Sequence, residues 1–236
     1  MVLKCVDRPS PNHDARAERP VDILVMHYTG MRTAAEALSR LCDPEAKVSA
    51  HYTVDRDGTL YVHVPEERRA RHAGISWWAG VRDVNSRSIG IEIVNPGHEF
   101  GYVPFAEAQI EAVVALSRDI LSRHPIPPSR VIGHSDVAPN RKQDPGELFP
   151  WARLAGNGIG LWPQSLPVAP PEMPLNQNER DTFTARLRQY GYGVPPDVDW
   201  PLRDVIAAFQ RHFRPVRIDG VADTESSAIL DALLET

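Results

Sequence analysis

Two histidines and an aspartate are placed where the chain could hold a metal ion. His27 lies near the end of the apolar run VDILVMHYT (21–29), and His134 ends the short run RVIGH (130–134). Because strand ends deliver side chains into a crevice, the two imidazoles could approach one point. Asp144 could add a carboxylate from a loop. Two histidines, one carboxylate and an open fourth position are typical of a catalytic zinc site. The alternative is three unrelated surface residues.

Two further residues carry chemistry that a zinc hydrolase needs. Glu92 interrupts the apolar run SIGIEIVN (88–95), where a carboxylate is costly unless it has a partner. It could accept the proton of a zinc-activated water and pass it to the leaving group. A structural salt bridge would also explain it. Lys142 could stabilise a developing oxyanion, or it could be an exposed loop lysine.

Strands and helices alternate over the first two thirds of the chain, and these elements must position the candidate residues. The patterns predict strands at 21–29, 88–95 and 130–134, a hairpin at 51–64, and helices at 33–42 and 104–124. This order predicts an α/β fold, with a mixed β-sheet flanked by helices. The Pro and Gly residues of segment 131–151 predict a loop rather than a helix there.

The last third of the chain has a different pattern. Residues 163–177 are rich in proline, which favours a semi-rigid linker. Beyond them, apolar residues recur at helical spacing in three segments, at 178–192, 201–213 and 223–235. The sequence therefore predicts a catalytic domain over 1–162, a linker over 163–177, and a small three-helix domain over 178–236, close to the lower size limit of independent folding.

Composition excludes several classes of protein. The 236 residues carry a net charge of -5, which gives no basic footprint for nucleic acid. No apolar run is long enough to span a membrane, and no obligate protein partner is evident. The N-terminal segment lacks the apolar core of a signal peptide. We therefore expect a cytoplasmic protein, with the periplasm as the alternative.

Four separated segments resemble those of zinc-dependent N-acetylmuramoyl-L-alanine amidases of the AmpD/AmiD type, relatives of the phage T7-lysozyme amidases and of peptidoglycan recognition proteins. In chain order within residues 8–160 they are VMHYTG, SAHYTVDRDGTLYVHVPEERRARHAG, NSRSIGIEIVN and GHSDVAPNRKQDPGELFPW. The resemblance implies a mixed sheet with zinc at one end. It also implies specific roles: zinc ligands at His27, His134 and Asp144, and catalytic residues at Glu92 and Lys142.

The C-terminal segment resembles a three-helix peptidoglycan-binding domain, through LRQYGYG, VIAAFQRHFRP and DGVADTESSAILDALL. A peptidoglycan or muropeptide substrate would also need contacts near the crevice. The segment RHAGISWW (71–78) and a nearby asparagine are candidates: Trp77 and Trp78 for stacking on sugars, Arg71 for a carboxylate, His72 for lining the site, and Asn85 for a hydrogen bond. Alternatively, the tryptophans pack on their own domain and the asparagine caps a turn.

Three functions remain open at this point. The first is an amidase that cleaves the bond between N-acetylmuramic acid, or its anhydro form, and L-alanine during turnover or recycling of the cell wall. The second is a recognition protein that binds muropeptides without cutting them. The third is a phage-type lytic amidase; Ala50 argues against it, because the phage branch places a tyrosine at this position.

Overall fold

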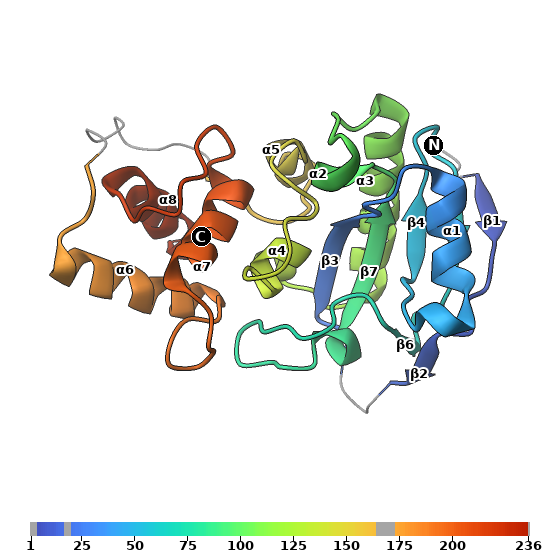
Figure 1. The fold of residues 1–236 in the computed structure, drawn as a ribbon, viewed down its shortest axis with the longest axis horizontal. Coiled ribbons are helices and arrows are strands. Elements are labelled where there is room, and N and C mark those ends of the chain that lie inside the picture. Colours follow the sequence, from blue (N-terminus) through green and yellow to red (C-terminus); the bar gives the residue numbers. More distant parts are fainter. Residues whose placement is uncertain (1–3, 17–19, 164–172, 236) are drawn as a thin grey trace.

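A computed structural model describes residues 4–16, 20–163 and 173–235. Its centre is a six-stranded mixed sheet with the order β1-β5-β4-β7-β3-β8, and a two-stranded sheet pairs β2 with β6 (Figure 1). The strands are β1 (Cys5–Asp7), β2 (His13–Ala15), β3 (Ile23–Tyr28), β4 (Tyr52–Val54), β5 (Leu60–Val62), β6 (Arg68–Ala70), β7 (Ser88–Ile93) and β8 (Val131–Gly133). The predicted linker lies mostly outside the described residues.

Strand β3 is parallel to both of its neighbours, β7 and β8. The register pairs His27 with Glu92 and Met26 with Gly133. Because side chains alternate along a strand, His27 and Glu92 point to the same face, and the isoleucines of β7 point to the other. His134 follows β8 directly, so three candidate site residues reach one edge of the sheet at the same level.

Helices cover both faces of the sheet. In Figure 1, α1 (Ala34–Cys42) lies in front of the strands and α3 (Glu107–Arg123) lies behind them. The cluster of apolar side chains under α3 includes the isoleucines of β7. Helix α1 begins at Thr33, whose hydroxyl accepts a hydrogen bond from the backbone N–H of Glu36. The short helices are α2 (Gly97–Phe100), α4 (His134–Val137) and α5 (Trp151–Ala155), and three 3-10 turns lie at 44–46, 84–87 and 128–130.

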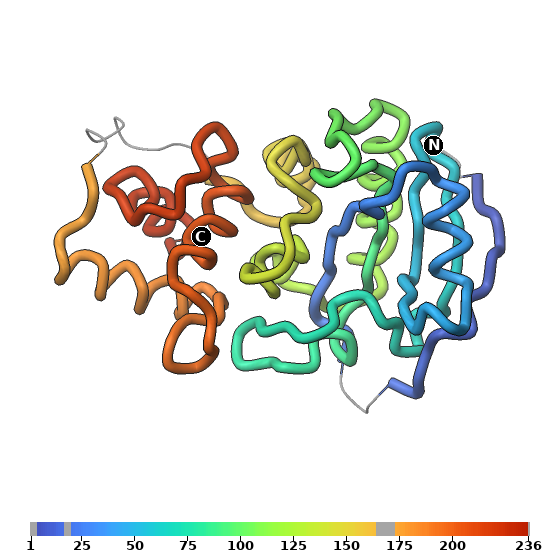
Figure 2. The backbone as a smooth tube through the Cα atoms, in the orientation of Figure 1, coloured from blue at the N-terminus to red at the C-terminus, as the bar shows by residue number. Residues whose placement is uncertain are grey.

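The last three helices are α6 (Gln177–Tyr190), α7 (Leu202–Phe213) and α8 (Thr224–Leu234). They share one continuous apolar cluster with residues of the sheet side, including Val25, Ile132 and Val137. In Figure 2 the loop 73–85 extends towards the loop after α6, and the backbone N–H of Ala79 donates to Gly191 O at 2.8 Å. The three helices are thus packed against the rest of the protein.

The predicted fold class is confirmed, and each predicted strand and helix lies within two or three residues of an observed one. The prediction for segment 131–151 was wrong in one respect. It contains a single helical turn, α4, which begins at His134. Strands β1, β2 and β6 were not predicted, because their short sequences, CVD, HDA and RRA, contain no apolar run. None of the helices in the described ranges has the length and apolar character needed to cross a bilayer.

Candidate metal centre

Three side chains from distant parts of the sequence converge at the edge of the sheet. His27 Nδ1 lies 3.0 Å from His134 Nδ1 and 3.1 Å from Asp144 Oδ2, and the last two atoms are 3.0 Å apart. All three residues are buried. Within the described residues, they form a group that could hold a metal ion.

The loop that carries Asp144 is fixed at both of its sides. Asp144 O accepts a hydrogen bond of 2.8 Å from the N–H of Ser135, next to His134. On the other side, Gly146 has a positive φ of 85°, and a Cβ atom there would lie 2.3 Å from the hydroxyl oxygen of Tyr102. That hydroxyl donates to Pro145 O at 2.6 Å. A glycine is therefore required for the loop to return close to α4.

The donor set fits a zinc ion. Two imidazole nitrogens and a carboxylate oxygen are typical ligands, at about 2.0–2.2 Å, which places ligand atoms roughly 3.3 Å apart in a tetrahedral site. The observed separations of 3.0–3.1 Å are slightly shorter. The second nitrogen of each histidine already has another partner, at 3.0 Å for His27 and 3.1 Å for His134. Each Nδ1 atom is thus directed only towards the shared point.

The protonation states also suit a metal. Burial, followed by the proximity of His134, lowers the pKa of His27 to about 4, so its ring is neutral at pH 7. Neutral imidazole and ionised carboxylate are the forms that bind metal.

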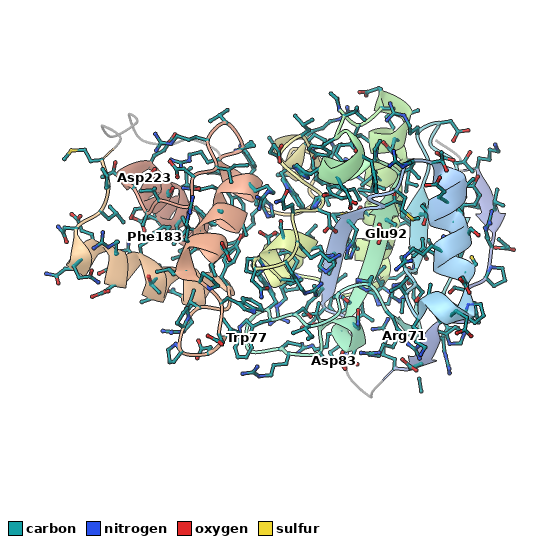
Figure 3. The ribbon with its side chains drawn as sticks, in the orientation of Figure 1. Arg71, Trp77, Asp83, Glu92, Phe183 and Asp223 are labelled. Atoms are coloured by element: carbon teal, nitrogen blue, oxygen red, sulfur yellow. The ribbon has the colours of Figure 1, made fainter. Side chains whose placement is uncertain are left out.

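Glu92 pairs with His27 across β7 and β3, on the same face of the sheet. Figure 3 labels Glu92 in the part of the molecule that contains the sheet. Its side chain is partly exposed to a cleft, but its Oε2 atom is buried and has no hydrogen-bond partner among the described residues. Burial, and then the charge of Asp144, raise the pKa of Glu92 well above its ordinary value, whereas Lys142 lowers it. No salt bridge explains Glu92 within the part of the chain that the structure describes. A carboxylate that faces the cleft and has one buried, unpaired oxygen beside possible metal ligands suits proton transfer.

The cleft above these residues has a volume of about 750 Å³. Glu92, His134 and Asp144 line it, and so do the predicted residues Lys142, Arg71 and His72. Arg71 is also paired with Asp14, at 2.6 Å. The lining includes basic residues from four parts of the sequence, namely Arg40, Arg71, Arg141, Lys142 and Arg211. The same lining also carries four carboxylates, on Glu92, Glu99, Asp144 and Asp204, so the cleft offers local cationic contacts and is not uniformly positive.

Three of the predicted substrate contacts lie elsewhere. Trp78 is only 1% exposed and packs against Tyr190 and Tyr192, so it cannot stack on a sugar. Trp77 does not line the cleft: Figure 3 places it near the C-terminal helices, and its ring lies 4.8 Å from the guanidinium of Arg82. The prediction of a sugar contact was therefore wrong for Trp78, and the alternative, that it packs within the protein, holds. Trp77 is partly exposed, and its contact with a sugar stays a prediction.

Asn85 was also predicted wrongly as a substrate contact. It is buried, and its Oδ1 accepts hydrogen bonds from the backbone N–H groups of His72 and Ala73. Its role in the structure is to hold a turn.

Arg211 was missed altogether. It comes from α7 and reaches the cleft, although its helix belongs to the predicted C-terminal domain. The amphipathic pattern of α7 does not reveal that this helix borders the cleft.

Together, the mixed sheet, the His-His-Asp group and the adjacent carboxylate are typical of a hydrolase whose residues could hold a metal ion. A comparison of the sequence with known families identifies it further. Residues 17–147 match Amidase_2, the N-acetylmuramoyl-L-alanine amidase family, and this is more than half of the chain. The chain therefore belongs to that family.

Proteins with similar sequences are amidases of the same kind. The chain is 41% identical to the N-acetylmuramoyl-L-alanine amidase AmiD of Escherichia coli, over 94% of this chain and 85% of the relative. It is 35% identical to the 1,6-anhydro-N-acetylmuramyl-L-alanine amidase AmpD of Enterobacter cloacae, over 62% of this chain and 86% of the relative.

Two solved structures are similar over nearly the whole chain. The first is E. coli AmiD in complex with the substrate anhydro-N-acetylmuramic acid-L-Ala-D-gamma-Glu-L-Lys; it has a TM-score of 0.83 and 40% identity, and covers 94% of this chain and 92% of that one. The second is AmpDh3 of Pseudomonas aeruginosa with anhydromuramic pentapeptide; its TM-score is 0.78 at 35% identity, with coverage of 93% and 94%. The similarity therefore extends to the C-terminal helices.

Proposed function

We propose that this protein is a zinc-dependent amidase that cleaves the bond between the lactyl group of N-acetylmuramic acid, or its anhydro form, and L-alanine of the stem peptide. The observation that carries this proposal is the convergence of His27, His134 and Asp144 at 3.0–3.1 Å beside the unpaired carboxylate of Glu92. Binding alone would not require a buried, unpaired carboxylate at this position.

His27, His134 and Asp144 would hold the zinc ion, which supplies a polarised carbonyl and a water of lowered pKa. Glu92 accepts a proton from the attacking water and returns it to the departing amine of L-alanine. The raised pKa of Glu92 suits both steps, because the same carboxyl group must first accept a proton as a base and then donate it as an acid. The ammonium group of Lys142 faces the same cleft and stabilises the negative charge that develops on the carbonyl oxygen.

The basic residues of the cleft are candidates for contacts with an anionic peptide. Muropeptides carry carboxylates on the stem peptide, and five basic residues line the cleft. Arg211 is a strong candidate for one such contact. Its Nε atom is buried without a hydrogen-bond partner in the described residues, and its nearest carboxylate, on Glu147, is 4.0 Å away. The relatives in solved complexes hold anhydromuramic peptides.

The proposal is tested by incubating the zinc-loaded protein with an anhydro-muropeptide and detecting the released peptide by mass spectrometry. Glu92→Gln should retain zinc and lose activity by about 10²–10⁴-fold, the usual contribution of a general acid–base. Glu111→Gln is the matched control, because Glu111 lies on the exposed side of α3. Full activity in Glu92→Gln would remove this residue from the mechanism. Binding of intact muropeptide without release of peptide would favour a recognition protein instead.

Comparison of intact sacculi with soluble anhydro-muropeptides as substrates separates degradation of the wall from recycling. The cytoplasmic location expected from the sequence stays a prediction, as does the peptidoglycan-binding role of the last three helices.

A further inference from the structure

The two ring nitrogens of His27 have different surroundings. Nδ1 faces Asp144 Oδ2 and His134 Nδ1, whereas Nε2 lies 3.0 Å from Nδ1 of His72. A neutral imidazole carries its proton on only one nitrogen. The tautomer of His27 therefore decides whether a lone pair or a proton points at the possible metal position.

A chain of hydrogen bonds determines this tautomer. The hydroxyl of Ser88 donates its single proton to Val84 O at 2.7 Å. Towards His72 Nε2, which is 3.3 Å away, the same oxygen can only accept. His72 must therefore carry its proton on Nε2, and its Nδ1 presents a lone pair to His27. It follows that His27 donates from Nε2 and leaves Nδ1 unprotonated.

His134 also carries its proton on Nε2 and leaves Nδ1 unprotonated, through a contact with Ala73, the residue after His72. Its Nε2 atom lies 3.1 Å from Ala73 O, and a carbonyl oxygen can only accept. The outer partners of both imidazoles thus belong to the consecutive residues 72 and 73. The side chain of Asn85 holds this pair, because its Oδ1 accepts from both backbone N–H groups, at 3.1 and 2.8 Å.

Strand β7 is shaped to admit the His72 ring. A Cβ atom on Gly90 would lie 2.5 Å from Cγ of His72, a distance that neither group could tolerate. Gly90 and Ser88 share the face of β7 that also carries Glu92. The glycine lets the ring lie against the strand, and Ser88 then meets its Nε2 atom.

We propose that His72 is a positioning residue, which accepts the Nε2 proton of His27 and so keeps the Nδ1 lone pair directed at the metal position. This inference rests on the zinc site of the proposed function. Without His72, the proton of His27 would move to Nδ1, where Asp144 Oδ2 at 3.1 Å is an acceptor. An incoming zinc ion would then have to displace that proton. Outer partners of this kind typically change metal affinity by about 10–100-fold.

The tautomer is measured directly by ¹⁵N NMR of the metal-free protein with labelled histidines. We expect Nε2–H tautomers for His27, His72 and His134 in the wild type. His72→Leu should move the His27 proton to Nδ1 and weaken zinc binding by about 10–100-fold, measured by competition with a chelator. His72→Asn should restore both properties in part, because its amide oxygen can take the place of the imidazole Nδ1 acceptor.

Two further variants make the test specific. Ser88→Ala removes the acceptor of the His72 Nε2 proton and should shift the His27 tautomer in the same direction, even if His72→Leu does not fold. His63→Leu is the matched control: His63 is a buried histidine that bonds Thr53 and Arg8 O, away from the metal position, so the His27 tautomer should not change. An Nδ1–H tautomer of His27 in the wild type would overturn the proposal. So would an unchanged tautomer and zinc affinity in His72→Leu. A wild type that has the expected tautomer but binds no zinc would instead overturn the proposed function.

Discussion

Removing one hydroxyl group at the junction between the sheet and the last three helices should destabilise the whole protein. Asp136, in α4, is fully buried and accepts three hydrogen bonds. The backbone N–H of Gly133 and Nδ1 of His212 donate to Oδ2, both at 2.7 Å, and the hydroxyl of Tyr192 donates to Oδ1 at 2.6 Å. The substitution Tyr192→Phe deletes the last of these and leaves Oδ1 without a partner in the described structure.

The magnitude follows from the burial of both groups. A hydrogen bond to a charged group contributes about 1.5–3 kcal/mol to the free energy of unfolding. Because Asp136 Oδ1 would be left buried and unpaired, we expect the loss to lie in the upper part of this range. Tyr192 and Asp136 are both 0% exposed, so water cannot replace the lost donor. We therefore expect a loss of about 2–3 kcal/mol. In a chain of this size that corresponds to a fall in Tm of roughly 4–12 °C.

The assay is urea and thermal unfolding of the metal-free protein, followed by circular dichroism and by tryptophan fluorescence. Tyr190→Phe is the matched control, because the Tyr190 hydroxyl makes no hydrogen bond within the described residues and lies near the same end of α6. We propose that the three helices unfold together with the sheet, because one apolar cluster contains residues of both. Both probes should then report a single transition that shifts in Tyr192→Phe.

Two results would refute this reasoning. The first is an equal stability of Tyr192→Phe and Tyr190→Phe, which would mean that the buried bond to Asp136 contributes nothing. The second is a pair of separate unfolding transitions, of which Tyr192→Phe shifts only the less stable one. That result would mean that the last three helices form an independent domain.

Three further outcomes are expected. Arg211→Ala should raise KM for an anhydro-muropeptide by about tenfold or more with a smaller change in kcat, if its guanidinium binds a substrate carboxylate; steady-state kinetics with Arg203→Ala as control checks this. Gly146→Ala should lose at least about 1–3 kcal/mol of stability from its positive φ, and more from the clash with Tyr102, measured by urea unfolding. Burial opposes the ionisation of Glu66, but bonds from Arg123, His124 and Tyr52 hold its pKa below the ordinary value. The wild type should therefore be more stable than Glu66→Gln at pH 7. This advantage should be lost as the pH falls below about 4.3 and through the lower pKa of the folded state, as measured by unfolding at a series of pH values.

The sequence predicted the parts of the fold that follow from local pattern. The apolar run of β3 and the amphipathic stripe of α3 each form an element whose residues are close in the chain, so periodicity was sufficient. Strands β1, β2 and β6 are short and mostly polar, so no apolar run marked them. Helix α4 was not predicted, because its single turn lies among Pro and Gly residues. A hydrogen bond between Ser135 N–H and Asp144 O holds this turn, and it forms only when the Asp144 loop is folded.

The candidate metal ligands were predictable for a different reason. His27 lies near the end of β3 and His134 directly follows β8; because the two strands are parallel neighbours, the sheet itself brings the histidines together. The tryptophans of loop 73–85 were predicted to contact sugars because the composition of a loop does not show whether it is exposed or packed against other helices. Only the tertiary structure shows that Trp78 is enclosed by Tyr190 and Tyr192. The positions of Arg211 and Asn85 likewise depend on long-range packing, which no local pattern encodes.

The shared apolar cluster constrains how such a chain can change during evolution. A gene that lost the last three helices would expose the apolar side chains of Trp78 and Val137 to water, and Asp136 would lose two of its three hydrogen-bond donors, His212 and Tyr192. Such a shortened descendant would need polar replacements on this surface before it could remain in solution. Replacing the last three helices with a foreign domain after residue 162 would meet the same obstacle, and would also remove the residues of α7 that line the cleft beside Glu92.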